Sequence, residues 1–399
     1  MKVLQIVPSI SLIYGGPSQM VLGLAPALAN VGVDVTILTT DSNGDNGQVP
    51  LDVVLNQPIR QDGYEIIYFR CSPFRRYKFS WDLLSWLNKH AHEYDLAHIH
   101  ALFSPVSSMA AAICRYRKLP YILRPLGTLD PADLRKKKQL KQIYAAVLER
   151  PNLAGAAAVH FTSSQEAKVS SRFGAITRDL VLPLGVIPAN QKVNEIDKNV
   201  LRRFDIPGDM PLILFMSRID PKKGLDLLIP ALLKLFNEGC KFHFVLAGTN
   251  PQDPSYEEAI KKQIQNSVLH PHTTITGFVT GELKSALLEA ADLFVLPSYY
   301  ENFGIAVAEA MVAGTPVVIS DQVHIWQEVH NSQSGWVAKT EVDSLTQKLK
   351  EALENPQECL NRGLNAQNYA LQHYSWDALA RQIYEFYQQV IPTPPAQVL

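Results

Sequence analysis

The fold is decided by one segment of the chain, residues 291–310, whose sequence is ADLFVLPSYYENFGIAVAEA. Its apolar run Leu293–Leu296 predicts a buried strand, Pro297 predicts a turn, and the residues from Phe303 onward predict a helix. A helix start presents backbone N–H groups that have no acceptor within the helix, and its dipole favours anions or hydroxyl oxygens. The segment therefore predicts an α/β sheet with a polar binding site at this strand-to-helix junction.

Apolar runs of strand length alternate with helix-length segments along the rest of the chain. This alternation predicts βαβ units, whose helical crossovers cover both faces of a parallel sheet. The polar stretch Asn190–Pro207 lacks clear periodicity and separates two series of runs. The runs are Val3–Val7, Val33–Thr39, Ile66–Phe69, Leu96–His100 and Tyr121–Leu123 in the first series, and Leu212–Met216, Phe242–Ala247, Thr274–Thr276, Leu293–Leu296 and Val317–Ile319 in the second.

The two series predict two domains, in keeping with a length of 399 residues. We expect a doubly wound, Rossmann-like parallel-sheet domain over residues 1–190 and a second one over residues 191–375, facing each other across a central cleft. The amphipathic helix expected over residues 376–390 packs back on the first domain. Ligands of such sheets bind outside the carboxyl ends of the strands.

The composition limits the class of protein. A chain with 47% hydrophobic and 19% charged residues is globular. No apolar run approaches the roughly 18 residues of a membrane-spanning helix, and the first run is too short for a signal peptide, so we expect a cytoplasmic protein. Residues 1–190 carry 20 Lys/Arg against 14 Asp/Glu (+6), and the remainder carries 17 against 24 (−7). The first half is therefore the one whose charge favours binding of an anion.

Two glutamates mark the predicted junction. Glu301 stands just before the helix start, and Glu309 stands about a turn and a half inside the helix. A carboxylate at the second position can accept hydrogen bonds from both hydroxyls of a ribose. On spacing alone, a helix-terminal charge and a solvated helix face are the alternative.

Two loops contain residue types that are typical of anion-binding sites, namely cations in one loop and paired glycines in the other. Arg218 and Lys223 flank a loop after the first strand of the second series, where cations and a helix start would stabilise a departing nucleoside diphosphate. Gly15 and Gly16 follow the first strand of the chain, and paired glycines let the backbone approach a phosphate. No dinucleotide-binding or P-loop spacing is present. A solvated basic turn and a plain strand-to-helix turn are the respective alternatives.

Together these features resemble the retaining glycosyltransferase family 4, also called glycosyltransferase group 1, whose members have the GT-B fold of two facing Rossmann-like domains. The resemblance covers nearly the whole chain. Besides the residues already named, it rests on the segments Asp95–His100, Gly277–Val279, Ala291–Ser298 and Ala313–Val318.

The resemblance implies a role for each matched residue. Glu309 would hold the ribose, Glu301 the hydroxyls of the donor sugar, and His100 a donor hydroxyl across the cleft. The implied catalytic residues are Glu301, Arg218, Lys223 and His100, and the implied donor-binding residues are Gly15, Gly16, Gly277, Phe278, Val279, Asn302, Phe303, Gly304, Ile305 and Glu309.

The acceptor side departs from the family pattern. Arg124 stands in the segment where many relatives have a histidine before the loop glycine, here Gly127, and Leu184 and Ile187 replace an Asn and an Asp. Arg124 and Gly127 are the acceptor-side candidates. The departures leave the donor chemistry intact but do not allow the acceptor to be transferred from relatives.

We expect transfer of a hexose, with retention, from a nucleotide-diphosphate sugar to a hydroxyl of a glycan, a lipid-linked sugar or a small saccharide. UDP is favoured over GDP or ADP as the carrier, and no cofactor is expected. No metal is expected either, because the chain has no D-x-D triplet and no paired cysteines. The alternatives are a sugar-nucleotide epimerase with Glu301 and His100 as acid and base, and a catalytically silent binding protein of the same fold.

A basic surface is expected in the first half. The run Arg135–Lys141 predicts a basic amphipathic helix, and Phe74–Phe79 adds cations among aromatics. Such surfaces favour peripheral contact with anionic lipid at the inner face of the membrane, and a solvated helix face is the alternative. No nucleic-acid reader motif accompanies these cations, so nucleic-acid binding is not expected.

Overall fold

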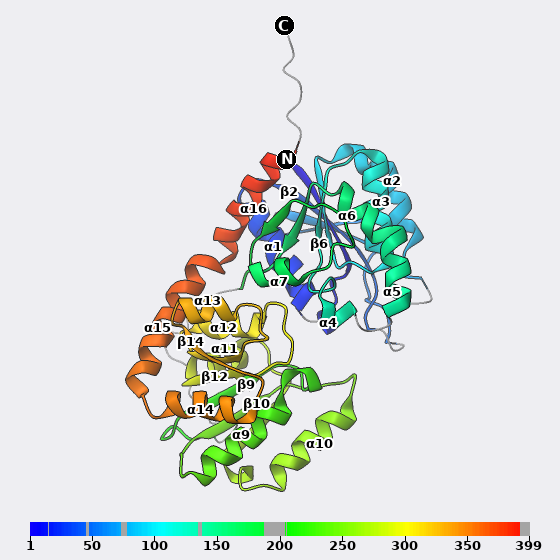
Figure 1. The fold of residues 1–399 in the computed structure, drawn as a ribbon. Helices are drawn as coiled ribbons and strands as arrows, with labels where there is room; N and C mark the ends of the chain where they lie inside the picture. Colours follow the sequence, from blue (N-terminus) through cyan, green and yellow to red (C-terminus); the bar gives the residue numbers. More distant parts are fainter. Residues whose placement is uncertain are drawn as a thin grey trace. The chain divides into compact units, whose positions relative to one another are not determined.

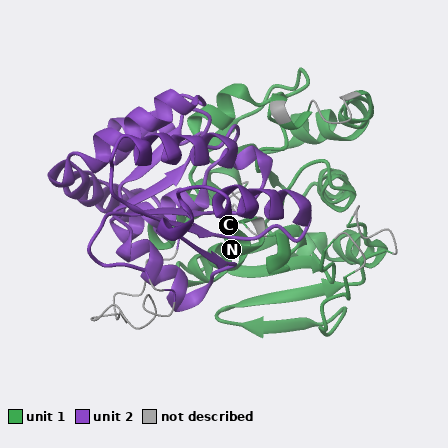
Figure 2. Ribbon diagram, turned by 90° about the horizontal axis from the view of Figure 1, so that it is seen from below, with its two compact units in different colours: residues 1–185, 376–399 green, residues 186–375 purple. Residues whose placement is uncertain are grey.

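The structure is a computed structural model that describes residues 1–14, 16–44, 48–72, 78–134, 138–186, 204 and 206–391. The chain divides into two compact units (Figure 2), Met1–Gly185 with Trp376–Leu399, and Val186–Ser375. The boundary expected at residue 190 and most of the expected linker lie outside the described residues. Within the described part, no helix is long and apolar enough to span a membrane.

The first unit contains a sheet with the strand order β3-β4-β2-β1-β5-β6-β7-β8. All neighbours are parallel except β3 and β4, which form an antiparallel hairpin at the sheet edge. The expected parallel sheet is confirmed apart from this edge hairpin, whose signal in the sequence is the Asp62–Gly63 dipeptide between the two strands. The strands are β1 (Lys2–Ser9), β2 (Asp34–Thr40), β3 (Pro58–Gln61), β4 (Tyr64–Phe69), β5 (Leu96–His100), β6 (Tyr121–Arg124), β7 (Ala158–Phe161) and β8 (Asp179–Val181).

Helices cover both faces of this sheet. In Figure 1, α1 and α16 lie on one side, and α2 and α3 lie on the other. The helices are α1 (Gly16–Asn30), α2 (Trp81–His90), α3 (Pro105–Arg117), α4 (Pro131–Leu134), α5 (Lys138–Tyr144), the π-helical turn η4 (Ala145–Glu149), α6 (Arg150–Gly155), α7 (Ser164–Val169) and α16 (Trp376–Val390), with short 3-10 turns η1 (Leu12–Tyr14) and η3 (Ala91–Glu93).

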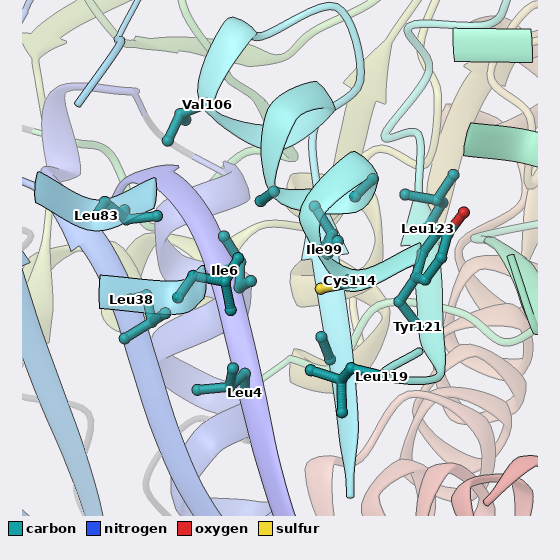
Figure 3. Packing of buried hydrophobic residues seen from close by; sticks show 14 of the residues in the cluster. Leu4, Ile6, Leu38, Leu83, Ile99, Val106, Cys114, Leu119, Tyr121 and Leu123 are labelled. Atoms are coloured by element: carbon teal, nitrogen blue, oxygen red, sulfur yellow. The ribbon is translucent and has the colours of Figure 1, made fainter. Parts of the chain in front are cut away.

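The core of the first unit lies between the central strands and the helices α2 and α3 (Figure 3). Leu4 and Ile6 of β1, Ile99 of β5 and Cys114 of α3 are completely buried there. Burial of each such aliphatic side chain contributes about 1.5–3 kcal/mol. The packing fixes where β1, β5 and β6 end, and hence where their loops begin.

The second unit contains a fully parallel sheet with the order β11-β10-β9-β12-β13-β14. The chain moves outward from β9 to β11, then returns to the other side of β9, so the strand order reverses between β9 and β12. The strands are β9 (Leu212–Met216), β10 (His243–Ala247), β11 (Thr273–Gly277), β12 (Leu293–Leu296), β13 (Val317–Ser320) and β14 (Gly335–Ala338). The helices are η5 (Pro221–Lys223), α9 (Leu225–Asn237), α10 (Pro254–Gln265), η6 (His270–His272), α11 (Gly281–Ala290), α12 (Ile305–Ala313), α13 (Trp326–Asn331), α14 (Val342–Leu353) and α15 (Pro356–His373).

The helix α16 belongs to the first unit although it follows the second in the chain. Its first residue, Trp376, packs against two glycines, Gly23 of α1 and Gly185. A Cβ atom added to Gly23 would lie 2.5 Å from the indole ring. Position 23 therefore requires glycine because the Trp376 ring leaves no room for a side chain, and not because of its backbone conformation.

We predict that Gly23→Ala destabilises the protein. In an open helix this change stabilises by about 0.5–1 kcal/mol, but overlap with Trp376 should cost about 1–3 kcal/mol. Urea denaturation measures the net loss. In a Trp376→Leu background the same change should be neutral or stabilising, and a loss of equal size there would contradict the explanation.

Candidate functional site

The strand-order reversal between β9 and β12 is the expected ligand site of the second unit, because loops leaving neighbouring strands diverge there. The loop after β9 carries Lys223, and the segment after β12 carries Glu301. Their side chains, both largely buried, form an ion pair between Lys223 Nζ and Glu301 Oε2. Two motifs that the sequence places 78 residues apart thus meet at this point.

The loop before Lys223 is shaped by a capped turn and a glycine. The Asp220 carboxylate accepts the Lys222 N–H at 3.1 Å and so starts the turn η5. Gly224 follows with φ 74°, and a Cβ atom there would overlap the carbonyl oxygen of Pro297. Only glycine lets the β9 loop come this close to the end of β12.

Glu301 is held in extended backbone. Its N–H donates to the Gln322 carbonyl at 3.1 Å, and its carbonyl accepts the His324 N–H at 3.0 Å. Burial by itself would raise the pKa of the Glu301 carboxyl, but the charges of Lys223, Lys222 and Arg218 hold that pKa below its ordinary value. Glu301 is therefore a carboxylate at neutral pH, suited to accept hydrogen bonds from hydroxyls.

The helix start lies where the sequence predicts it. Gly304, with φ 79°, precedes α12, which begins at Ile305. The Phe303 ring is buried in a T-shaped contact with Tyr374, 5.3 Å between centroids. With this ring turned into the core, the backbone amides near Gly304 form the polar end of the helix. Asn302 stands directly before them and is half-buried.

Glu309 has a partner that the sequence analysis missed. Its Oε1 lies 2.5 Å from Nζ of Lys284 on α11, and both side chains are half-buried. From sequence, Lys284 looks like any solvated helix cation, because nothing in its neighbourhood indicates the contact with α12.

The loops after β9, β10 and β11 line up along the same sheet edge. Gly277 ends β11 and accepts the N–H of Gly248 at 2.8 Å. Gly248, also missed from sequence, has φ 151° and lies so close to Ser217 that a Cβ atom would overlap its carbonyl oxygen. The Phe278 ring is 74% exposed and Val279 is buried.

Arg218 stands at this same edge, at the end of β9. It is exposed, and its Nη1 donates to Gln252 at 3.1 Å.

The candidates of the first unit are mostly buried. His100 ends β5 and Arg124 ends β6 as its parallel partner, and both side chains are almost completely buried. Gly127 donates its N–H to the Glu166 carboxylate at 2.7 Å. Gly16 is the first residue of α1, and Gly15 lies outside the described residues. The proposed contacts of His100 and Arg124 with substrates remain predictions.

A chain of hydrogen bonds fixes the protons of the buried histidines. His160 Nε2 lies 3.0 Å from the Leu182 carbonyl, which only accepts, so this nitrogen carries a hydrogen. Its Nδ1 then accepts from His98 Nε2 at 3.3 Å. His98 Nδ1 in turn accepts from the Tyr387 hydroxyl at 2.7 Å.

The series of hydrogen bonds continues from Tyr387 of α16 to His100 through Gln5. The Tyr387 oxygen accepts from Gln5 Nε2 at 3.1 Å, and Gln5 Oε1 accepts from His100 Nε2 at 2.8 Å. His100 therefore carries its hydrogen on Nε2. Its Nδ1 is buried, and among the described residues it has no partner.

No three His, Cys, Asp or Glu side chains of the described ranges are grouped as metal ligands. The positive charge at the site comes from Lys222, Lys223 and Arg218.

Family models match both halves of the chain. The model of the glycosyl transferases group 1 matches residues 197–369, and that of the glycosyl transferase 4-like domain matches residues 15–185. The chain belongs to the group 1 glycosyl transferases.

Three similar proteins illustrate this membership. An uncharacterized glycosyltransferase of Methanocaldococcus jannaschii is 31% identical over 48% of this chain and 48% of its own length, so the match spans about half of that relative. Sucrose-phosphate synthase from Thermosynechococcus elongatus has a TM-score of 0.78 at 21% identity, covering 98% of this chain and 99% of that one. Anabaena HepE, in complex with UDP and glucose, has a TM-score of 0.73 at 20% identity, covering 98% and 100%. Both units thus have the sheets of the GT-B fold.

We predict that Gly224→Ala destabilises the protein more than Gly239→Ala. Both glycines have positive φ, and an alanine in that conformation lowers the stability by about 1–2 kcal/mol. Only at Gly224 would the added Cβ atom also overlap a carbonyl oxygen, that of Pro297, which lowers the stability further by about 1–3 kcal/mol. Urea denaturation of the two variants compares them directly. Equal losses would mean that the contact with Pro297 relaxes freely.

We also predict that stability falls on acidification. Burial, together with the charge of Arg124, lowers the pKa of His98, His100 and His160 well below 6.5. The unfolded chain binds protons there below about pH 6.5 and the folded chain does not, so each histidine costs about 1.4 kcal/mol per pH unit below that value.

Urea denaturation at pH 7.5 and pH 5.5 measures this loss. Nitrogen-15 NMR of the imidazoles should show the neutral Nε2–H form of all three histidines at pH 5.5. Protonated rings at that pH would contradict the hydrogen-bond assignment.

Proposed function

We propose that the protein is a retaining, metal-independent hexosyltransferase that transfers a sugar from a UDP-sugar to a hydroxyl acceptor. The reaction takes place in the cytoplasm, with peripheral contact at the inner face of the membrane through residues 135–141. The observation that carries the proposal is the ion pair of Lys223 with Glu301 at the strand-order reversal of the second unit. UDP and a hexose are favoured by analogy with HepE, whose structure contains UDP and glucose.

The two charges of this pair suit the two halves of a nucleotide-sugar. Lys223 with Arg218 would bind the diphosphate and stabilise it as the glycosidic bond breaks, and the amides of Phe303, Gly304 and Ile305 at the helix start would bind the sugar. Glu301, ionised beside Lys223, would accept hydrogen bonds from the sugar hydroxyls. Positive charge is thus available to the leaving group from side chains alone, which supports a reaction without metal.

Retention follows if leaving group and acceptor occupy the same face of the sugar. The departing diphosphate leaves with the anomeric bond's electron pair, the acceptor oxygen attacks that carbon, and a phosphate oxygen takes the acceptor's proton. Glu301 positions the sugar and forms no covalent bond in this scheme. A glycosyl group trapped on Glu301 would contradict it.

The epimerase alternative is less well supported. It requires Glu301 to exchange a proton, and a carboxylate whose pKa is held down by neighbouring cations is a weak base. Incubation of UDP-glucose alone discriminates the alternatives, since an isomerised sugar nucleotide would favour the epimerase.

The acceptor is proposed to be a saccharide or a lipid-linked sugar. The membrane contact rests on the basic run, of which residues 135–137 lie outside the described residues. Lys141 of this run is already paired with Asp133 at 2.7 Å, so it contributes little free charge to a lipid surface.

We predict that Glu309→Gln weakens UDP binding about 10-fold or more, because hydrogen bonds to a charged group contribute about 1.5–3 kcal/mol. If Glu309 holds the ribose hydroxyls, the unmodified protein prefers UDP to 2′-deoxy-UDP and the variant loses this preference. Titration calorimetry measures all four affinities. Glu238→Gln, which breaks a surface pair with Lys350 at 2.8 Å, is the matched control.

Equal affinity of Glu309→Gln and the unmodified protein for UDP would contradict the ribose contact. Failure of the unmodified protein to bind UDP, GDP or ADP would contradict the donor site itself and favour the silent binding protein.

A further inference from the structure

Three bulky apolar residues of the first unit have left-handed backbone. Phe103, Leu126 and Phe173 have φ values of 58°, 56° and 51°. Positive φ is rare for bulky side chains and is strained, and such strain concentrates at functional sites. Across the described ranges, the other large non-glycine residues with positive φ are polar or charged, and one of them, Lys118, ends a helix.

Two of the three residues follow neighbouring strands at the carboxyl edge of the sheet, and two are in ring contact. Phe103 follows β5 and Leu126 follows β6, which are neighbouring parallel strands. The Phe103 and Phe173 rings meet edge to face, 6.1 Å between centroids. The strand order of the first sheet reverses between β1 and β5, so Phe103 stands where ligands of such sheets bind.

Buried carboxylates hold two of these loops in place. Glu149 accepts the Phe103 N–H at 2.7 Å and the Ser108 hydroxyl at 2.6 Å. Glu166 accepts the N–H of Gly127, the neighbour of Leu126, at 2.7 Å. Both carboxylates are at most 1% exposed. Burial raises the pKa of the Glu149 carboxyl, and hydrogen bonds offset the cost of burying both groups. These contacts fix the backbone of the two loops.

The rings form a surface with a polar pair beside it. Phe103, Phe173 and Tyr144, whose ring lies 5.8 Å from that of Phe103, are each half-buried. We call these three residues the aromatic platform. Lys141 Nζ lies 5.5 Å from the centre of the Phe103 ring and forms its ion pair with Asp133, whose side chain is 35% exposed.

We propose that the aromatic platform binds the acceptor, and that the acceptor is a cyclic polyol, that is, a sugar or a cyclitol ring. The C–H face of such a ring packs on aromatic carbon, and its hydroxyls donate to Asp133 and accept from Lys141. An ion pair offers both a donor and an acceptor, which a purely apolar ligand would leave unused. The assignment as acceptor site rests on the proposed function, whereas polyol binding does not.

Saturation-transfer NMR on the full chain tests the site with three probes: methyl α-D-glucopyranoside, myo-inositol and 2-deoxystreptamine. At least one probe should receive saturation on its ring C–H protons. Phe103→Leu and Asp133→Asn should each reduce that transfer by about five-fold or more, the loss of about one hydrogen bond or ring contact. Asp133→Asn alters a partly exposed side chain and so tests the site without disturbing the core.

Phe79→Leu is the matched control, because Phe79 is equally half-buried at the rim of the core, where it contacts Trp81 at 4.8 Å. It should leave the transfer unchanged. No transfer from the unmodified protein to any probe, or equal transfer with Phe103→Leu and Asp133→Asn, would overturn the proposal. Transfer lost equally in Phe79→Leu would also overturn it.

A parallel titration with UDP separates the two hypotheses. UDP binding without polyol binding leaves the proposed function standing and rejects the platform. Polyol binding without UDP binding supports the platform as a polyol site and rejects UDP as the donor's nucleotide. If GDP and ADP also fail to bind, the donor site itself is rejected.

Discussion

The second unit depends on one close approach, that of Gly224 to the carbonyl oxygen of Pro297. Loops that leave neighbouring strands at a reversal of strand order normally diverge and make room for a ligand. Here the missing Cβ atom lets them touch at their base. That contact places Lys223 and Glu301 within reach of each other, while the helix start at Gly304 stays beside them. The position of this ion pair therefore rests on a backbone contact that involves no charged group.

The loops at the carboxyl edge of the first sheet are held in a different way from those of the second sheet. The loops of the first sheet are held by buried carboxylates, Glu149 and Glu166, which accept backbone N–H groups, whereas the second sheet uses glycines and an ion pair. A loop tied to a buried carboxylate keeps its shape whatever lies in front of it. The Lys223–Glu301 pair, by contrast, joins two side chains, which in the proposed function would exchange their hydrogen bonds with those of the donor. The first arrangement fits the proposed binding of a rigid ring, and the second fits the proposed reaction, in which charges change.

Much of the fold could be predicted from sequence, because parallel strands are continuous apolar runs. Leu96–His100 and Leu293–Leu296 are strands with the predicted bounds. β3 was missed because Pro58–Gln61 is short and mostly exposed at the sheet edge. Among the site residues, Glu301 and Lys223 could be placed from motif and position. Lys284, Gly248 and the left-handed Phe103 could not, since each depends on a neighbour far away in sequence that local patterns do not contain.

The position of α16 has a consequence for how the chain is made. During synthesis, β1 to β8 leave the ribosome long before Trp376 and Tyr387, and the whole second unit lies between them. Until α16 arrives, the hydrogen bonds of His98 and Gln5 to the Tyr387 hydroxyl cannot form. The first unit, although first in the chain, thus completes its core last, and until then it exposes an apolar face that a chaperone could hold.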